Sequence, residues 1–437
     1  MSLLHVLEGE VRSGEDWTDR LRISAKEVEE LIASKILRPH DEKLRLTFVG
    51  LIAYASHAVY CRPKFAKDIG FSLQQTIVTL ERYFGTGGSR KSVVDSIRYP
   101  EFPNRSALRE LDVAHELDAW FKSHGVYRQE HQRLGNSGRT HWPRTIASQQ
   151  PLHVQGSTIY PQPVAVRREG ILNEVTALQM GVTRTLVEKY ELPAVGGLRH
   201  AELAAGPLIG EWPLGETDSA YYLRRLDVER RTIFRSDTLR LLSTLRSALT
   251  VTLGRSSQPR IFGTTAFYAV WEDACRSLFK SHACLLPMTN PTWTVPNTGR
   301  GVTTIEHEQI PDLIFSSESF VYIADAKYYW PFPAARPGMS DIVKQLYYAE
   351  TTESKKSIRS LFFLPNTQGQ KPVLLGCTRV ASAMRTFPPI EAWGLDPILM
   401  LTGYACGSFE ALGDVIGVLD RGSFQVTEMI SETPASV

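Results

Sequence analysis

The spacing of apolar residues predicts a chain that alternates between helices and strands. Residues 1–45 are rich in charge and mostly follow a helical spacing. Two apolar runs within 46–66, separated by polar residues around Ser56, predict two neighbouring strands. Segment 72–84 predicts an amphipathic helix with a single apolar stripe. That stripe consists of Leu73, Ile77, Leu80 and Phe84.

The middle of the chain is mostly helical by the same criterion. A long helix is predicted over 106–124. Residues 135–166 begin as a polar loop and continue as short strands interrupted by prolines. Helical spacing returns over 170–190 and 216–250, which precede a polar segment at 255–262.

A domain boundary is predicted at this polar segment. The 437 residues are more than one hydrophobic core usually serves. We expect a mixed α+β N-terminal region over 1–255, with a further split near 150–170. The C-terminal region, 256–437, should form a central mixed sheet flanked by helices. The predicted fold class is therefore multidomain α/β.

The C-terminal region follows the order helix, hairpin, helix, strand, strand. Its first helix lies within 264–280, and its hairpin is formed by 310–316 and 320–327 around the turn sequence "SSES". A helix over 341–350 follows. The remaining predicted strands are 359–364 and 372–378.

Three charged residues stand at the ends of the two hairpin strands, namely Asp312, Asp325 and Lys327. A charge at the end of a buried strand is costly unless it is paired or bound to a metal. Lys327 lies two residues after Asp325, so both side chains lie on one face of the strand.

Two further polar residues come from the flanking helices. Glu272 lies beside the apolar stripe of its helix, next to half-apolar surroundings. In the later helix, Gln345 shares one face with Asp341, Lys344 and Tyr348, at positions i, i+3, i+4 and i+7. We expect the opposite face to be the buried one. It consists of Ile342, Leu346 and Ala349.

The order of these residues, E…PD…DxK…QxxY, resembles the PD-(D/E)xK nuclease core. The resemblance implies hydrolysis of phosphodiester bonds with Mg²⁺, for which Mn²⁺ can substitute. Hard oxygen ligands suit such an ion. The metal ligands implied are Asp312, Asp325 and Glu272, and the catalytic residues implied are Asp312, Asp325, Lys327, Glu272 and Gln345. Related nucleases have Q-x-x-x-Y, so the roles of Tyr347 and Tyr348 stay open.

Three longer segments resemble the LlaJI-type restriction endonuclease family. They are "FVG…PK" within 48–65, "GRTHWPRTI" at 138–146 and the "D-x-x-K-Q-x-x-Y" helix at 341–348. That family is related to the nuclease subunit McrC. The resemblance implies a DNA-cleaving subunit of a restriction or phage-defence system. It also implies a McrB-like AAA+ GTPase as partner, with 1–255 serving recognition of DNA or of that partner.

Several residues are candidates for contact with double-stranded DNA. Arg139, Trp142 and Arg144 can contact phosphates or stack on a base, or they can be a structural arginine over a packed tryptophan. Lys344 and Tyr348 are further candidates. The Arg-rich segment 224–246 can line a DNA groove or form a solvated face. In the second case its arginines pair with Asp227 and Glu229.

Composition excludes several other classes. The net charge of +2 excludes a histone-like basic protein. The five cysteines are scattered without CxxC spacing, which supports neither a zinc site nor a disulfide framework. The longest apolar stretch, about 13 residues, is too short to span a bilayer. We therefore expect a cytoplasmic protein without membrane contact. "GTGGSRKS" at 85–92 lacks the Gly before Lys of a phosphate-binding loop.

The predicted function is thus an Mg²⁺-dependent endodeoxyribonuclease that works with a GTP-driven motor. One alternative is a stand-alone site-specific restriction enzyme. A second is a catalytically inactive module that binds DNA or activates the motor. Cutting both strands usually requires two active sites, which makes a homodimer a candidate assembly.

Overall fold

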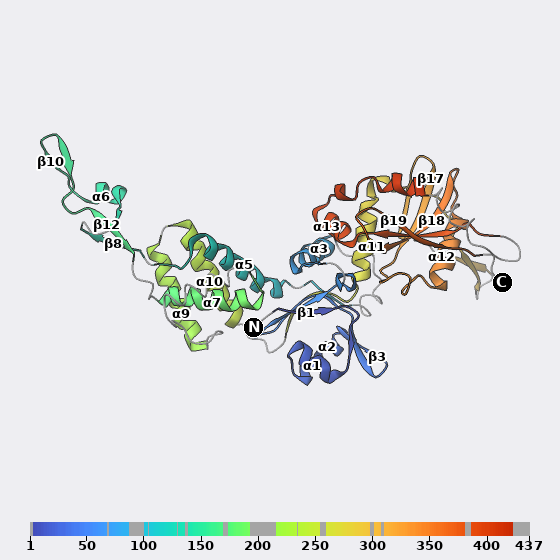
Figure 1. The fold of residues 1–437 in the computed structure, drawn as a ribbon, viewed down its shortest axis with the longest axis horizontal. Coiled ribbons are helices and arrows are strands. Elements are labelled where there is room, and N and C mark those ends of the chain that lie inside the picture. Colours follow the sequence, from blue (N-terminus) through green and yellow to red (C-terminus); the bar gives the residue numbers. More distant parts are fainter. Residues whose placement is uncertain are drawn as a thin grey trace. The chain divides into compact units, whose positions relative to one another are not determined.

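The structure of the chain is a computed structural model with a mixed α/β fold (Figure 1). The residues that it describes are 3–67, 70–86, 100–103, 105–128, 130–135, 139–168, 174–192, 216–233, 235–253, 259–297, 301–306, 310–380 and 386–422. The chain divides into two compact units. Unit 1 consists of Met1–Leu4, Ile52–Val59 and Asn104–Phe262. Unit 2 consists of His5–Leu51, Tyr60–Pro103 and Gly263–Val437.

Unit 1 has a helical bundle and a small β-rich part. Its bundle helices are α5 (Ser106–His124), α7 (Glu174–Lys189), α9 (Glu216–Thr232) and α10 (Ser236–Leu253). α10 packs on α5, α7 and α9 through leucines that are almost completely buried. These leucines are Leu226, Leu241, Leu242, Leu245 and Leu249. The helices predicted over 106–124, 170–190 and 216–250 are confirmed.

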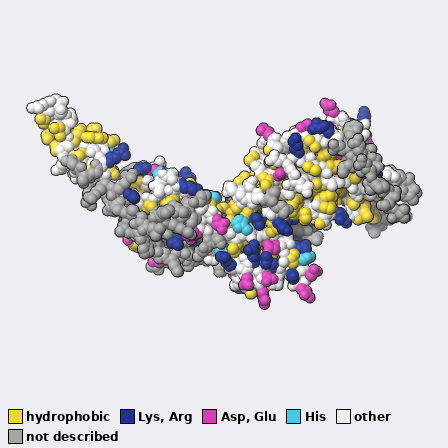
Figure 2. Space-filling model, in the orientation of Figure 1, with side chains coloured by type: hydrophobic (Ala, Val, Ile, Leu, Met, Phe, Trp, Pro, Cys, Tyr) yellow, Lys and Arg dark blue, Asp and Glu magenta, His cyan; other side chains and the backbone are white. Residues whose placement is uncertain are grey.

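The β-rich part of unit 1 comprises β8 (Glu130–Leu134), β9 (Arg139–Thr140), β12 (Val164–Arg168), the hairpin β10 (Leu152–Val154) and β11 (Ser157–Ile159), and α6 (Trp142–Ser148). The three-stranded sheet has the order β8-β12-β9. Figure 2 shows hydrophobic side chains on the surface of this part. The large exposed ones are Leu134, Trp142, Ile146, Leu152, Val154 and Ile159.

The N-terminal segments of unit 2 contain more strands than their sequence pattern predicts. The elements are β1 (Leu3–Leu7, of which only His5–Leu7 belong to this unit), β2 (Val11–Arg12), α1 (Gly14–Leu21), α2 (Ala25–Ala33), β3 (Leu37–His40) and β4 (Lys43–Leu46). The two helices follow serine capping boxes at Ser13 and Ser24. The expectation of a mostly helical segment 1–45 is wrong beyond them. A tight turn at Asp41, with φ of 53°, folds β3 back onto β4.

A five-stranded sheet with the order β1-β6-β5-β13-β7 follows, most of which belongs to unit 2. Its other members are β5 (Val49–Ala53), β6 (Ala58–Arg62), β7 (Glu101–Phe102) and β13 (Arg260–Thr264). β5 and β6 confirm the strand pair predicted around Ser56. The short helix η1 (Lys64–Lys67) and α3 (Leu73–Gly85) come next, and α3 confirms the predicted amphipathic helix.

The C-terminal part of unit 2 is built on a mixed five-stranded sheet with the order β16-β17-β18-β20-β19. The strands are β16 (Leu313–Ser316), β17 (Phe320–Ala326), β18 (Ser357–Pro365), β19 (Val373–Thr378) and β20 (Ile390–Leu395). β17, β18 and β20 run parallel, whereas the outer strands run antiparallel to their neighbours. The helices are α11 (Phe267–Leu278), α12 (Met339–Thr351) and α13 (Pro397–Cys406).

The sequence pattern did not predict two elements of this C-terminal part. One is the hairpin of β14 (Thr292–Asn297) and β15 (Gly301–Glu306), and the other is β20. The C-terminal part of unit 2 also contains the short helices η2 (Lys280–His282) and η3 (Glu410–Leu412). α12 contacts β17, β18 and β20, while α11 contacts β17 and α13.

Residues 5–51 and 60–103 group with 263–437 in unit 2, so the N-terminal segments share a compact unit with the C-terminal sheet. The division of roles between 1–255 and 256–437 stays a prediction. Most of the "GTGGSRKS" segment lies outside the described residues. Within the described part of the chain, no helix combines the length and apolar character needed to cross a membrane.

Candidate active site

The β16–β17 hairpin forms as its sequence predicts. Ser317 closes the turn, because its backbone N–H donates to the Phe320 carbonyl at 3.0 Å and its Oγ accepts from the Phe320 N–H at 3.1 Å. The register pairs Leu313 with Ala324. Asp312 and Asp325 lie one step beyond this pair, on neighbouring strands.

The structure brings three of the predicted residues together where the hairpin strands meet. The Ala326 N–H donates to Asp312 Oδ2 at 3.1 Å, which fixes that carboxylate beside β17. Lys327 Nζ lies 2.8 Å from Asp325 Oδ2. The Lys327 N–H donates to the Phe363 carbonyl on β18 at 2.9 Å. The two carboxylates and the ammonium therefore form one cluster.

The buried carboxylates of this cluster have too few nearby partners to balance their negative charge. Asp325 is 1% exposed, and burial together with the neighbouring Asp312 carboxylate raises its pKa to about 7, against the lowering effect of Lys327. Burial likewise raises the pKa of Glu272 to about 7, where Lys327 acts to lower it and Asp325 to raise it. Neither carboxylate oxygen of Asp325 has a well-formed hydrogen bond within the described residues, and Oδ2 forms an ion pair with the Lys327 ammonium at 2.8 Å. The site therefore favours a cation.

Lys327 lies between the carboxylates of Asp325 and Asp341. Asp341 was not predicted from the sequence as a site residue. Lys327 Nζ is 3.6 Å from Asp341 Oδ1, and Asp341 Oδ2 accepts from the Tyr329 hydroxyl at 3.1 Å. Burial lowers the pKa of Lys327, but the three carboxylates of Asp325, Asp312 and Asp341 outweigh it and raise the pKa overall. The ammonium is therefore kept charged. The signal for Asp341 was its position on the polar face of the predicted helix.

α12 turns that polar face toward the sheet, so the expectation of a buried Ile342, Leu346 and Ala349 face is wrong. Gln345 is fully buried, and its Nε2 donates to the carbonyls of Ile323 at 3.0 Å and Leu361 at 2.8 Å. These bonds join α12 to β17 and β18, which explains why a polar residue is buried here. The three apolar residues are only half-buried.

The structure also separates the two tyrosines of α12. Tyr348 is 6% exposed, and its hydroxyl donates to the Ile310 carbonyl at 3.3 Å, just before Asp312. Tyr347 is 41% exposed. Tyr347 is therefore the more accessible of the pair, and Tyr348 supports the loop that carries Asp312.

Two exposed cations lie near the acids. Burial lowers the pKa of Lys344, but the carboxylate of Asp325 and its other neighbours raise it overall. Arg276, which the sequence reading missed, donates from Nε to the Asp312 carbonyl at 3.4 Å and pairs with Asp273 at 3.1 Å. It follows Glu272 by four residues, so one helix face carries both. Both cations can meet an anionic ligand at this site.

The oxygen-rich cluster suits a hard divalent cation by its chemistry. Asp325 offers a buried carboxylate with an unused oxygen, and Asp312 lies beside it. Within the described ranges, however, no three His, Cys, Asp or Glu side chains gather closely enough to hold a metal on their own. A cation here would need oxygens other than those of three carboxylates, from backbone, water or substrate.

Comparison with known proteins identifies the family. The LlaJI restriction endonuclease family matches residues 48–374, most of the chain. The chain belongs to this family. It is also 22% identical over 370 residues to "Type II restriction enzyme BsuMI component YdjA" of Bacillus subtilis (strain 168), covering 77% of this chain and 76% of that protein.

Two solved structures of Thermococcus gammatolerans assemblies are similar at 13% identity. One is the "half-complex from tetradecameric assembly" of "McrB AAA+ hexamers with bound McrC", which matches with a TM-score of 0.37 and covers 96% of this chain and 100% of that one. The other is the "McrBC complex", which matches with a TM-score of 0.25 and covers 63% and 88%.

Three DNA-contact candidates of this LlaJI-family chain lie in unit 1. Trp142 is 56% exposed, and its ring meets Tyr160 edge-on at 6.2 Å, so it is not a packed core tryptophan. Arg139 and Arg144 are exposed. His141 caps α6 by accepting from the Arg144 N–H at 3.2 Å. The exposed residues are available to a ligand, and their role stays a prediction.

The Arg-rich helices of the LlaJI-family chain are partly neutralised by other helices. Arg225 pairs with Glu174 at 3.2 Å, and Arg246 pairs with Asp227 at 3.2 Å. Glu229 is buried and accepts from the Tyr127 hydroxyl at 2.6 Å. These contacts tie the bundle together and account for part of the charge run without DNA.

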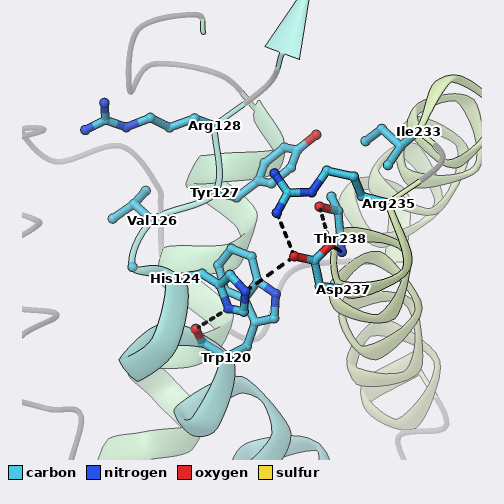
Figure 3. A pocket seen from close by; sticks show the side chains of 10 residues that line it. Trp120, His124, Val126, Tyr127, Arg128, Ile233, Arg235, Asp237 and Thr238 are labelled. Carbon is cyan, nitrogen blue, oxygen red and sulfur yellow. Dashed lines mark hydrogen bonds and ion pairs between the residues drawn. The ribbon is translucent and has the colours of Figure 1, made fainter. Parts of the chain in front are cut away.

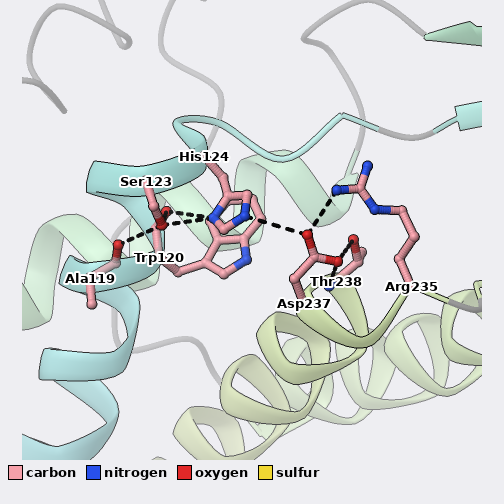
Figure 4. Close-up of polar contacts among 7 residues, drawn as sticks. All are labelled: Ala119, Trp120, Ser123, His124, Arg235, Asp237 and Thr238. Atoms are coloured by element: carbon pink, nitrogen blue, oxygen red, sulfur yellow. Dashed lines mark hydrogen bonds and ion pairs between the residues drawn. The ribbon is translucent and has the colours of Figure 1, made fainter.

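The bundle also contains a hollow of about 500 Å³ beside the start of α10 (Figure 3). His124 stacks on Trp120 with ring centroids 4.8 Å apart, and its Nε2 lies 3.4 Å from Asp237 Oδ2 (Figure 4). Arg235 meets the same carboxylate at 2.8 Å. Asp237 is thus a bridge between α5 and α10, which the sequence reading did not single out.

Proposed function

We propose that this chain is the DNA-cleaving subunit of a restriction or phage-defence system, with a PD-(D/E)xK nuclease core and dependence on Mg²⁺. The observation that carries the proposal is the cluster of Asp312, Asp325 and Lys327 at the meeting ends of β16 and β17. Membership of the LlaJI restriction endonuclease family supports it.

The carboxylates would hold the metal, and the cations would hold the substrate. Asp312 and Asp325 are the proposed direct ligands, completed by backbone, water or substrate oxygens, and Glu272 is proposed to reach the ion through one of those waters. A bound Mg²⁺ lowers the pKa of a coordinated water and neutralises charge on the phosphate. The ammonium of Lys327, held 2.8 Å from Asp325, orients the attacking water and stabilises the negative charge that develops on the phosphate oxygens.

The remaining residues assist from around this cluster. Lys344 and Arg276 neutralise the phosphates next to the cleaved bond. Gln345 contributes by joining α12 to the strand that carries Asp325, through its bonds to Ile323 and Leu361. Arg139 and Trp142 in unit 1 are proposed as further contacts to double-stranded DNA.

A McrB-like AAA+ GTPase is the proposed partner. The proposal rests on the sequence resemblance of the chain to the McrC-related family. A homodimer or a partner-driven pairing would supply the second active site for cutting the other strand. The proposed location is the cytoplasm, where the DNA substrate is found.

Cleavage of plasmid DNA tests the proposal. The purified chain is incubated with modified and unmodified plasmid and Mg²⁺, with and without the neighbouring-gene ATPase or GTPase and nucleotide. Asp325→Ala should abolish cutting. Asp396→Asn is the matched control, because Asp396 caps α13 by accepting from the Ile398 N–H at 2.8 Å and asparagine caps equally well.

The outcomes separate the alternatives. Cutting that needs the motor supports the proposed subunit, and cutting without it supports a stand-alone restriction enzyme. An absence of cutting in every arm, with DNA or motor binding intact, supports the inactive module and refutes the nuclease assignment.

A further inference from the structure

A buried contact holds the residue directly after Lys327. Tyr328 is 7% exposed and meets two residues from distant parts of unit 2. Glu8 directly follows β1, and Lys64 begins η1 after β6. We call Glu8, Lys64 and Tyr328 the tyrosine clamp. Lys64 belongs to the "FVG…PK" segment, to which the proposed function gives no role.

The clamp holds Tyr328 at three points. Its hydroxyl donates to Glu8 Oε2 at 2.9 Å and lies 3.2 Å from the Lys64 N–H, which donates to it. The Lys64 ammonium donates to the Tyr328 carbonyl oxygen. The same ammonium lies 4.0 Å from the centroid of the Tyr328 ring. Side chain, ring face and backbone are therefore all fixed.

Aromatic packing surrounds these polar contacts. The Tyr328 ring lies 6.3 Å from Phe65, which it meets edge-on, and 5.4 Å from Phe267 at the start of α11. Phe65 and Phe267 are almost completely buried. Because Glu272 lies on the same helix as Phe267, the clamp contacts two of the elements that build the site.

The tyrosine clamp contacts the backbone directly after the end of β17, where hydrogen bonds to the sheet stop. β17 ends at Ala326, and the Lys327 N–H makes its last bond to β18, at the Phe363 carbonyl. Beyond that bond, the contacts of Tyr328 fix the direction of the backbone. The Lys327 side chain must reach Asp325 at 2.8 Å and Asp341 at 3.6 Å, so a rotation of the backbone here would displace its ammonium.

We propose that Glu8 and Lys64 are positioning residues that aim the Lys327 ammonium at the acidic cluster through Tyr328. The catalytic part of this inference rests on the proposed nuclease function. The positional part does not, because it concerns only the environment of Lys327. Burial raises the pKa of the Glu8 carboxyl while Lys64 acts to lower it, in agreement with a mutually dependent pair.

The test uses the full chain, with its partner where cleavage requires one. Tyr328→Phe removes only the hydroxyl, Lys64→Met removes the ammonium, and Lys64→Arg restores a cation. Tyr322→Phe is the matched control. It removes the hydroxyl of a buried tyrosine within β17, which donates to Asp420 and lies on the strand face opposite to that of Asp325.

Two readouts are measured beside thermal unfolding. The first is the rate at which an amine-reactive ester labels Lys327, whose side chain is 18% exposed, followed by mass spectrometry of the peptide in metal-free buffer. The second is the single-turnover cleavage rate at saturating DNA and Mg²⁺, together with the affinity for DNA in Ca²⁺.

Tyr328→Phe and Lys64→Met should label faster at Lys327 and cut more slowly, by about 10- to 100-fold, with unchanged DNA affinity. Lys64→Arg should recover much of both properties, and Tyr322→Phe should change neither beyond its loss of stability. Labelling and cleavage equal to those of Tyr322→Phe would overturn the clamp. If the wild-type chain cuts no DNA, the nuclease function fails, and the labelling of Lys327 still decides the positional claim.

Discussion

Replacing Asp325 by asparagine should stabilise the metal-free protein at neutral and alkaline pH. Burial and Asp312 raise the pKa of Asp325 from 3.8 to about 7, so the folded state prefers the protonated acid. The stability that this preference contributes is fully present below about pH 4 and is lost as pH rises toward 7. Above pH 7, the ionised carboxylate costs about 4 kcal/mol, at 1.36 kcal/mol per pKa unit.

Asparagine carries no charge at any of these pH values. The free energy of unfolding of Asp325→Asn minus that of the wild type should therefore rise by about 4 kcal/mol between pH 4 and pH 8. This difference between two pH values cancels the effect of the amide on packing. Lys327 keeps Asp341 as a partner at 3.6 Å in the variant.

The assay is urea unfolding in EDTA at several pH values, followed by hydrogen exchange of peptides from 310–330. Added Mg²⁺ should stabilise the wild type most strongly at pH 8 and should have little effect on Asp325→Asn, because the ion would neutralise the carboxylates. Asp396→Asn should show neither effect. A variant that is less stable than the wild type at pH 8 in EDTA, or that shares its pH dependence, would refute the reasoning about buried charge.

Three other substitutions probe other contacts of unit 2. Gln345→Leu should lower the free energy of unfolding by about 1–3 kcal/mol, measured by urea titration, because the carbonyls of Ile323 and Leu361 lose their donor. Lys344→Ala should leave stability unchanged and reduce the salt dependence of DNA binding by about one unit of slope, measured by fluorescence anisotropy. Gly263→Ala should lower the stability of the protein by at least about 1–3 kcal/mol, measured in a thermal melt, because a Cβ at this position would lie 2.3 Å from the Val49 carbonyl oxygen.

The hairpin that carries the site could be predicted because its signals are local. Two short apolar runs and the "SSES" turn between them define the hairpin within 310–327, and its register pairs Leu313 with Ala324, one residue before Asp312 and Asp325 are reached. The capping serines of α1 and α2 are equally local. Residue types and short spacing therefore sufficed for Asp312, Asp325 and Lys327 to be found together.

Features decided by distant contacts could not be predicted in this way. β20 is a short run between two prolines and a helix, and it is an inner strand because it pairs with β18 on one side and with β19 on the other. The helical pattern of α12 favours an apolar buried face, yet the carbonyls of Ile323 and Leu361 draw Gln345 inward. No local periodicity encodes an acceptor on another strand.

The tyrosine clamp is also formed by contacts between distant parts of the sequence, and it bears on the proposed function. Lys64 and Tyr328 are separated by 264 residues, and the "PK" dipeptide reads in isolation as a strand end. Because residues 5–51 and 60–103 share unit 2 with the sheet, the lysine of the DxK motif is supported by side chains from the opposite end of the sequence. The hairpin supplies the reactive groups, but their orientation depends on Glu8 and Lys64. Unit 2 is therefore discontinuous in sequence, and a fragment cut at residue 256 would retain every motif residue while losing the contacts that hold Tyr328.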